Sequence, residues 1–188
     1  MSPSPSPVRA RLLDSAQRRF AADGALATTL DDVRADAGAS VGAVYHHFPD
    51  KEALLDAVRT QALADFQAAF LSELERHPAA EEGVRAIVAF LVRWCGGNRD
   101  GAKLLLSERP REAERLNREF FERVRAWWRP HVHYGALRDV DLLLLHALWL
   151  GPTMELVRHW LDGAAPKPPR LQIAVLADAA WSTLKEER

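Results

Sequence analysis

Apolar residues recur at spacings of three and four along most of this chain, and this feature restricts its fold more than any other. Leu12, Leu13, Ala16 and Phe20 form the first such stripe. The spacing places side chains on one face of an α-helix. The sequence shows no convincing alternating strand pattern and no hairpin dipeptide between apolar runs. We therefore predict an all-α protein of about nine helices, at residues 8–22, 30–37, 41–48, 51–76, 80–96, 100–107, 111–131, 140–161 and 169–185.

The composition argues against several classes of protein. The 188 residues suffice for one sizeable domain or for a small domain fused to a larger one. Cys95 is the one cysteine, so neither an internal disulfide nor a thiolate metal cluster can form within the chain. The N-terminal Ser/Pro stretch has no apolar signal region, and no uncharged apolar run approaches the roughly 18 residues of a membrane span. We expect a cytoplasmic protein that uses no membrane, metal or cofactor.

Two short predicted helices, residues 30–37 and 41–48, are joined by a turn that contains Gly38. Glycine can adopt the left-handed conformation that so sharp a turn requires. Val33 and Val44 would hold the two helices at a fixed angle. This is the helix-turn-helix arrangement, whose second helix enters the major groove of DNA. Small residues on that second helix would let its backbone come close to the DNA.

Lys51 follows this motif in the first turn of the fourth predicted helix. The helix dipole disfavours a cation there, and a phosphate bound at the helix N-terminus would explain the lysine. The segment from Leu12 to Val58 contains LLDSAQRRFAADG, TTLDDV, AGAS and VYHHFPDKEALL in that order. It resembles the DNA-binding domain of TetR-family transcriptional regulators. The resemblance implies a cytoplasmic, all-helical homodimer, usually a repressor that a small ligand releases from DNA.

The resemblance also implies which residues contact double-stranded DNA at a palindromic operator. Residues at the start of the second helix and around the end of the recognition helix would bind phosphates, and the small residues between them would face the groove. Few of these side chains can make bidentate contacts with a base, so specificity is expected to rest on methyl contacts, on Arg34 and on DNA shape. The implied contacts are Thr28, Thr29, Ser40, Val41, Gly42, Ala43, Tyr45, His46 and Lys51, and we add Arg34, which stands where the family usually has alanine.

The first 50 residues carry no basic excess. They contain five arginines and six aspartates, and the whole chain has a formal net charge of −1. The usual electrostatic signature of a nucleic-acid-binding domain is therefore missing. Four arginines oppose one aspartate between residues 8 and 22, which favours a positive edge there. We expect modest affinity for each subunit, so that useful binding requires a dimer.

Large aromatic residues concentrate after the predicted DNA-binding domain, where all six tryptophans lie. A helical domain of this size needs large side chains in its core, but ligand pockets in helical bundles are also apolar with a few polar groups. Both interpretations stay open for the same residues. The resemblance places a pocket for an apolar or aromatic effector among Phe66, Phe90, Trp94, Phe120, Val124, Trp128, His131, Leu145, His146 and Trp149.

The last two predicted helices have more apolar residues than one core face requires. A terminal helix that is apolar on two faces usually packs against partners on both. A four-helix interface between two copies of the chain would explain the surplus, and it would hold two recognition helices about 34–36 Å apart, one turn of DNA. The interface would comprise Leu148, Pro152, Leu156, Trp160, Leu171, Val175 and Ala179.

These patterns predict three parts of the chain. They are a disordered arm at residues 1–7, a DNA-binding domain at residues 8–50, and a ligand-binding and dimerisation domain at residues 51–188, entered through a linking helix at residues 51–76. The leading hypothesis is a ligand-responsive DNA-binding regulator that acts as a repressor. The alternative is a helical ligand-binding or scaffold protein that no longer binds DNA. No set of acid, base and nucleophile in the sequence indicates an enzyme.

Overall fold

The computed structural model describes residues 6–107, 110–111 and 113–187. Ten α-helices occupy this part of the chain, which contains no strand beyond an isolated bridge between Leu137 and Lys185. The predicted all-α class is confirmed. Residues 1–5 of the predicted arm lie outside the described residues, and Pro7 is already the first residue of a helix.

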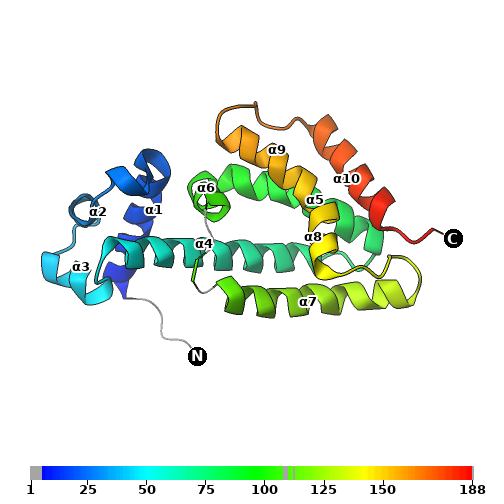
Figure 1. Cartoon of the computed structure of the whole chain (residues 1–188), viewed down its shortest axis with the longest axis horizontal. Helices are drawn as coiled ribbons and strands as arrows, with labels where there is room; N and C mark the ends of the chain where they lie inside the picture. Colours follow the sequence, from blue (N-terminus) through cyan, green and yellow to red (C-terminus); the bar gives the residue numbers. More distant parts are fainter. Residues whose placement is uncertain (1–5, 108–109, 112, 188) are drawn as a thin grey trace. The chain divides into compact units, whose positions relative to one another are not determined.

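The helices follow each other along the chain with short connections (Figure 1). Their bounds are α1 (Pro7–Ala27), α2 (Leu30–Asp36), α3 (Val41–His47), α4 (Lys51–Leu74), α5 (Ala80–Gly97), α6 (Arg99–Ser107), α7 (Ala113–His133), α8 (Leu142–Trp149), α9 (Gly151–Leu161) and α10 (Arg170–Leu184). Within the described residues, no helix combines the length and the apolar character that crossing a membrane requires.

The single helix predicted at residues 140–161 was wrong, because the chain forms α8 and α9 instead. Pro152 has no N–H to donate to the preceding turn, and its ring crowds that turn. Leu150 N closes α8 by donating to the His146 carbonyl at 3.0 Å. Met154 N then donates to the Leu150 carbonyl at 2.8 Å, so the helical bonding resumes after a break at Leu150.

The chain divides into two compact units, of which the first comprises Met1–Ala64 and Asp100–Ala113 and the second Asp65–Arg99 and Glu114–Arg188. Helix α4 therefore begins in unit 1 and ends in unit 2. This division follows packing and does not test the functional boundary predicted after Asp50, which stays a prediction.

The core of unit 1 is formed by the apolar stripe of α1 and the inner faces of α2 to α4. Leu12, Ala16 and Phe20 are buried together with Val33 and Val44. The periodic spacing of these residues is what places them on the inner faces. Burying each large aliphatic or aromatic side chain contributes about 1.5–3 kcal/mol, so this core fixes the angle between α2 and α3.

The core of unit 2 is aromatic, and α10 packs along α5 and against α8 (Figure 1). Phe70 and Trp149 lie near its centre with ring centroids 5.8 Å apart. Trp149 Nε1 donates to the Val84 carbonyl at 2.9 Å, which satisfies its buried polar atom. Gly83 makes room for the Trp127 ring, because a Cβ atom there would lie 2.4 Å from Trp127 Cζ2.

Candidate functional site

The turn between α2 and α3 is built as the sequence predicts. Gly38 has a φ of 59°, which lies in the left-handed region that glycine adopts without strain. Val33 and Val44 are buried on either side of the turn. Two side chains of α1 stabilise the turn by hydrogen bonds to its backbone. Arg11 Nε donates to the Ala37 carbonyl at 3.0 Å, and Ser15 Oγ donates to the Val33 carbonyl at 3.3 Å.

One face of α3 points to solvent. Val41 is 54% exposed and Tyr45 is 58% exposed, although both are large hydrophobic residues. Gly42 and His46 are exposed as well, whereas Ala43 is half-buried. Ser40 caps the helix and is also exposed; its Oγ accepts a hydrogen bond from Ala43 N at 3.2 Å. The structure therefore brings the predicted groove-facing residues together on one short, accessible helix.

The two predicted phosphate-binding threonines are engaged inside the domain. Thr28 is 1% exposed, and its hydroxyl donates to the Gly24 carbonyl at 3.0 Å. Thr29 caps α2: its hydroxyl donates to Asp32 Oδ2 at 2.6 Å and accepts from Asp32 N at 3.2 Å. Hydrogen bonds from the Thr29 hydroxyl and backbone N–H lower the pKa of Asp32. Both hydroxyl protons thus form hydrogen bonds at helix ends within unit 1, and the phosphate role of the two threonines stays a prediction.

Lys51 lies at the first residue of α4, where its ammonium donates to the Ala25 carbonyl at 2.8 Å. This contact was not predicted, because the sequence does not reveal that the chain after Gly24 turns back towards α4. An ammonium has three N–H donors, so two remain for a phosphate. Lys51 can therefore join the end of α1 to the start of α4 and still offer N–H donors to a second acceptor.

Most arginines of unit 1 that the structure describes form contacts within that unit. Arg34 Nε donates to Asp31 Oδ1 at 3.0 Å, so this predicted base reader is held beside the turn. Arg19 forms two bonds to Asp36, of 2.6 and 3.0 Å, which raise the pKa of Arg19 and lower that of Asp36. The Arg9 guanidinium lies 5.5 Å from the centre of the Phe48 ring. The predicted positive edge is therefore partly neutralised.

The residues predicted to line an effector pocket are mostly packed against each other in the core of unit 2. Trp128 and Trp149 lie with ring centroids 5.5 Å apart, and Trp128 Nε1 donates to the Arg138 carbonyl at 3.2 Å. Burial lowers the pKa of His131, whose ring lies 4.4 Å from that of Trp127. The buried members are Phe90, Phe120, Val124, Trp128, Leu145 and Trp149, and the partly buried members are Phe66, Trp94, His131 and His146.

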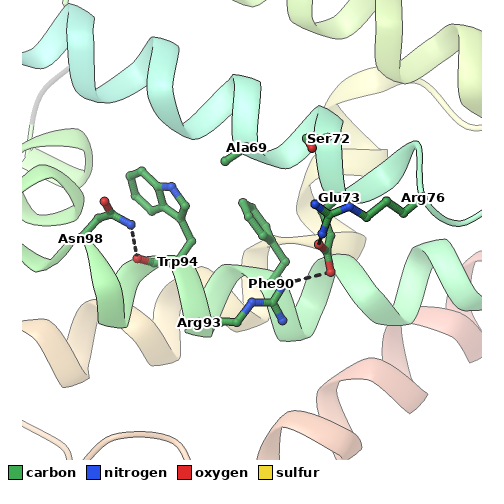
Figure 2. Close-up of a pocket in the computed structure, with 8 residues that line it drawn as sticks. All are labelled: Ala69, Ser72, Glu73, Arg76, Phe90, Arg93, Trp94 and Asn98. Carbon is green, nitrogen blue, oxygen red and sulfur yellow. Dashed lines mark hydrogen bonds and ion pairs between the residues drawn. The ribbon is translucent and has the colours of Figure 1, made fainter.

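Two of these predicted residues, Phe90 and Trp94, line a hollow of about 360 Å³ between α4 and α5 (Figure 2). Among the polar groups around it, Glu73 and Arg76 were not predicted as site residues. Glu73 Oε1 accepts from Arg93 at 2.9 Å, and Glu73 Oε2 accepts from Arg76 at 3.3 Å. Arg76 follows the end of α4 in the structure, and the predicted helix at residues 51–76 did not indicate which other helix Arg76 would approach.

The predicted dimer-interface residues differ in their exposure. Leu171 is 76% exposed and Val175 is 58% exposed on α10, whereas Trp160 is 8% exposed. Arg99 and Lys167 lie over the Trp160 ring, at 5.1 and 5.7 Å from its centre, so this tryptophan is engaged within its own unit. Pro152 and Ala179 are exposed, and Leu148 and Leu156 are half-buried. Helix α8 adds two exposed leucines that were not predicted, Leu143 and Leu144.

Together, the turn at Gly38 and the exposed α3 define a helix-turn-helix protein of the DNA-binding class. A family model described as bacterial regulatory proteins, tetR family, matches residues 12–58. The N-terminal domain of this chain is therefore a helix-turn-helix domain of the TetR family.

Individual proteins resemble the chain over different extents. The HTH-type transcriptional repressor KstR2 of Rhodococcus jostii (strain RHA1) is 42% identical over 57 residues, which are 30% of this chain and 28% of that repressor. The crystal structure of a TetR family transcription regulator from Marinobacter aquaeolei VT8 has a TM-score of 0.80 at 21% identity, over 96% of this chain and 97% of that one. A tetR-family regulatory protein from Rhodococcus RHA1 has a TM-score of 0.76 at 22% identity, over 98% and 100%. The structural likeness extends the shared fold to nearly the whole chain.

Proposed function

We propose that this protein is a transcriptional repressor that binds a palindromic operator as a homodimer in the cytoplasm and is released by a small apolar or aromatic effector. The observation that carries the proposal is the exposed face of α3, with Val41, Gly42, Tyr45 and His46, in a domain of a family of regulatory proteins. The name of the Rhodococcus relative, a transcriptional repressor, supports the same role here.

In this proposal α3 lies in the major groove and its flanks contact phosphates. Tyr45 offers an exposed hydroxyl donor, and Lys51 offers two ammonium N–H groups beyond its bond to Ala25. Such contacts position the protein without reading sequence. Residues 8–50 serve as the DNA-binding part, and residues 51–188 bind the effector and the second subunit.

The test is a fluorescence-anisotropy titration of the full chain against DNA selected from a random pool, at two salt concentrations. Tyr45→Phe removes one phosphate-directed hydroxyl and is expected to weaken binding to every sequence by about tenfold or more, because a hydrogen bond to a charged group contributes a net ~1.5–3 kcal/mol. Tyr134→Phe is the matched control, since Tyr134 is 79% exposed at the end of α7 and is the other tyrosine of the chain.

Specific, salt-sensitive binding that Tyr45→Phe weakens and Tyr134→Phe leaves intact would support the proposal. Phosphate contacts release counterions, so affinity must fall as salt rises. A chain that selects no DNA sequence, or binds with no salt dependence, would instead be a helical ligand-binding or scaffold protein. Equal affinities of the wild type and Tyr45→Phe would remove Tyr45 from the contacts.

A further inference from the structure

The hollow between α4 and α5 combines an aromatic wall with an excess of positive charge. Phe90 and Trp94 supply the wall, and Phe66 packs edge-on against Trp94 with ring centroids 5.1 Å apart. Figure 2 shows the side chains of Phe90 and Trp94 extending from α5 towards Ala69 of α4. Its volume of about 360 Å³ lies at the small end of the ~300–1,000 Å³ range of ligand pockets. Such a space suits a ligand with one or two rings.

Two arginines at the hollow share one carboxylate. The Glu73 side chain is 13% exposed and accepts from both Arg93 and Arg76. Two guanidinium groups and one carboxylate leave one positive charge, and each guanidinium has five N–H donors. The Arg93 and Arg76 side chains are 60% and 70% exposed, so donors remain accessible to a second anion. Planar guanidinium groups suit a carboxylate because they can donate two parallel hydrogen bonds.

Further donors surround the same space. Trp94 Nε1 has no hydrogen-bond acceptor within the described part of the chain, unlike the indole groups of Trp127, Trp128 and Trp149, which donate to backbone carbonyls. Ser72 adds a hydroxyl on the α4 side of the hollow. The hollow thus offers mostly donors, which a ligand must match with acceptor atoms. A cationic ligand would meet the surplus positive charge.

We propose that this hollow binds a small aromatic carboxylate, with the ring against Phe90 and Trp94 and the carboxylate at Arg93 and Arg76. The assignment of this hollow as the effector site rests on the proposed function, and it adds the chemical class of the effector. The bound carboxylate shares Arg93 with Glu73, and the Glu73–Arg93 pair joins α4 to α5. Helix α4 carries Lys51 at its first residue and Glu73 next to its last. A ligand that competes for Arg93 therefore acts on the helix that also carries a proposed DNA contact.

Isothermal titration of the full chain with 2-naphthoate and with its neutral analogue 2-naphthamide tests the site. Because a charge-assisted hydrogen bond exceeds a neutral one by about 1.4 kcal/mol, naphthoate is expected to bind about tenfold more tightly than the amide. Arg93→Gln and, separately, Arg76→Gln are expected to weaken naphthoate binding and leave the weak binding of the amide unchanged. Arg158→Gln is the control, because Arg158 pairs with Glu155 on α9 and has a comparable exposure of 48%.

Ligand-induced quenching of tryptophan fluorescence places the site, since it is expected to disappear in Trp94→Phe. The proposal is overturned if naphthoate shows no saturable binding, if the amide binds equally well, if both arginine variants bind as the wild type does, or if quenching survives Trp94→Phe. Circular dichroism checks that each variant is folded, and Arg76→Gln keeps the test decisive if Arg93→Gln unfolds. The titration contains no DNA and therefore tests the site separately from the proposed function. If the chain binds naphthoate but binds no DNA, the proposed function is rejected and the site is retained.

Discussion

The residues on the exposed face of α3 are short or apolar, which limits how they can distinguish bases. Val41 is the first residue of the helix and ends in two methyl groups without a polar atom. In the major groove, the apolar feature of a base pair is the thymine methyl group. Val41 is thus suited to recognise thymine by contact between methyl groups, whereas Arg34 is held by Asp31 and is less available for bases.

We predict that one position in each half-site requires the thymine methyl group because of Val41. Replacing that thymine by uracil removes one methyl, worth ~0.8 kcal/mol, and should weaken binding by about fourfold. Anisotropy titrations with operators that carry single uracils would locate the position. Val41→Ala should bind the thymine and uracil operators equally. Unchanged affinity at every uracil, or the same sensitivity in Val41→Ala, would contradict the prediction.

His131 makes the stability of the protein depend on pH. Burial lowers its pKa below the ordinary value of 6.5, so the folded protein favours the neutral ring. The unfolded chain binds a proton more readily, and stability therefore declines as pH falls below about 6.5. Above that pH, His131 is neutral in both the folded and the unfolded protein, so its contribution to stability is fully present.

Urea unfolding of the wild type and His131→Gln between pH 5 and 8 should show this difference. We expect a smaller loss of stability in His131→Gln on the acid side, since glutamine carries no proton to bind. His133→Gln changes an exposed histidine of the same helix. Its free energy of unfolding should depend on pH as that of the wild type does. Identical slopes in the wild type and His131→Gln would show that burial of His131 does not produce the effect.

At the scale of elements, the sequence predicts what depends on local pattern and misses what depends on packing between distant segments. The helix-turn-helix was predictable because Gly38 and the apolar spacing of α2 and α3 lie within a few residues of each other. To predict the interruption at Leu150, the helix-breaking effect of Pro152 had to be given more weight than the continuous apolar run around it. Aromatic residues at helical spacing do not reveal whether they fill a core or line a pocket. The Glu73–Arg93 pair joins residues of two helices, and no periodicity predicts it.

The fit of α5 against α7 depends on a missing side chain at Gly83. We predict that Gly83→Ala destabilises the protein by about 1 kcal/mol, because overpacking costs ~1–3 kcal/mol and exceeds the ~1 kcal/mol gain in helix propensity. The Trp127 ring cannot easily move away, since its Nε1 donates to the His77 carbonyl at 3.0 Å. Urea denaturation would measure the change.

Gly97→Ala in the same helix provides the comparison. A Cβ atom at Gly97 would meet no atom within 4 Å, so this variant should be neutral or slightly more stable. Equal effects of the two substitutions would mean that the Trp127 contact does not restrict position 83.

At the scale of the whole molecule, unit 2 leaves several large apolar side chains in solvent. Leu143 and Leu171 are 79% and 76% exposed, on α8 and α10, which pack against each other. Monomeric proteins rarely expose large contiguous apolar patches, and those that occur often mark interaction sites. The proposed palindromic operator requires a second copy of the chain as the partner, because two half-sites need two recognition helices related by a twofold axis.

We predict that the double variant Leu171→Glu with Val175→Glu is monomeric in light scattering and retains its helical content. A twofold interface brings four buried carboxylates close together, and each unpaired buried charge is costly. The control is Leu26→Glu, which places the same charge at a leucine that is 98% exposed in unit 1 and should leave the dimer intact. The monomer should bind an isolated half-site as well as the wild type does but lose most of its preference for the full operator, because one subunit no longer holds the other at the second half-site. A dimer that persists would exclude this face of α10 from the interface, and Leu143→Glu would then test whether α8 provides it.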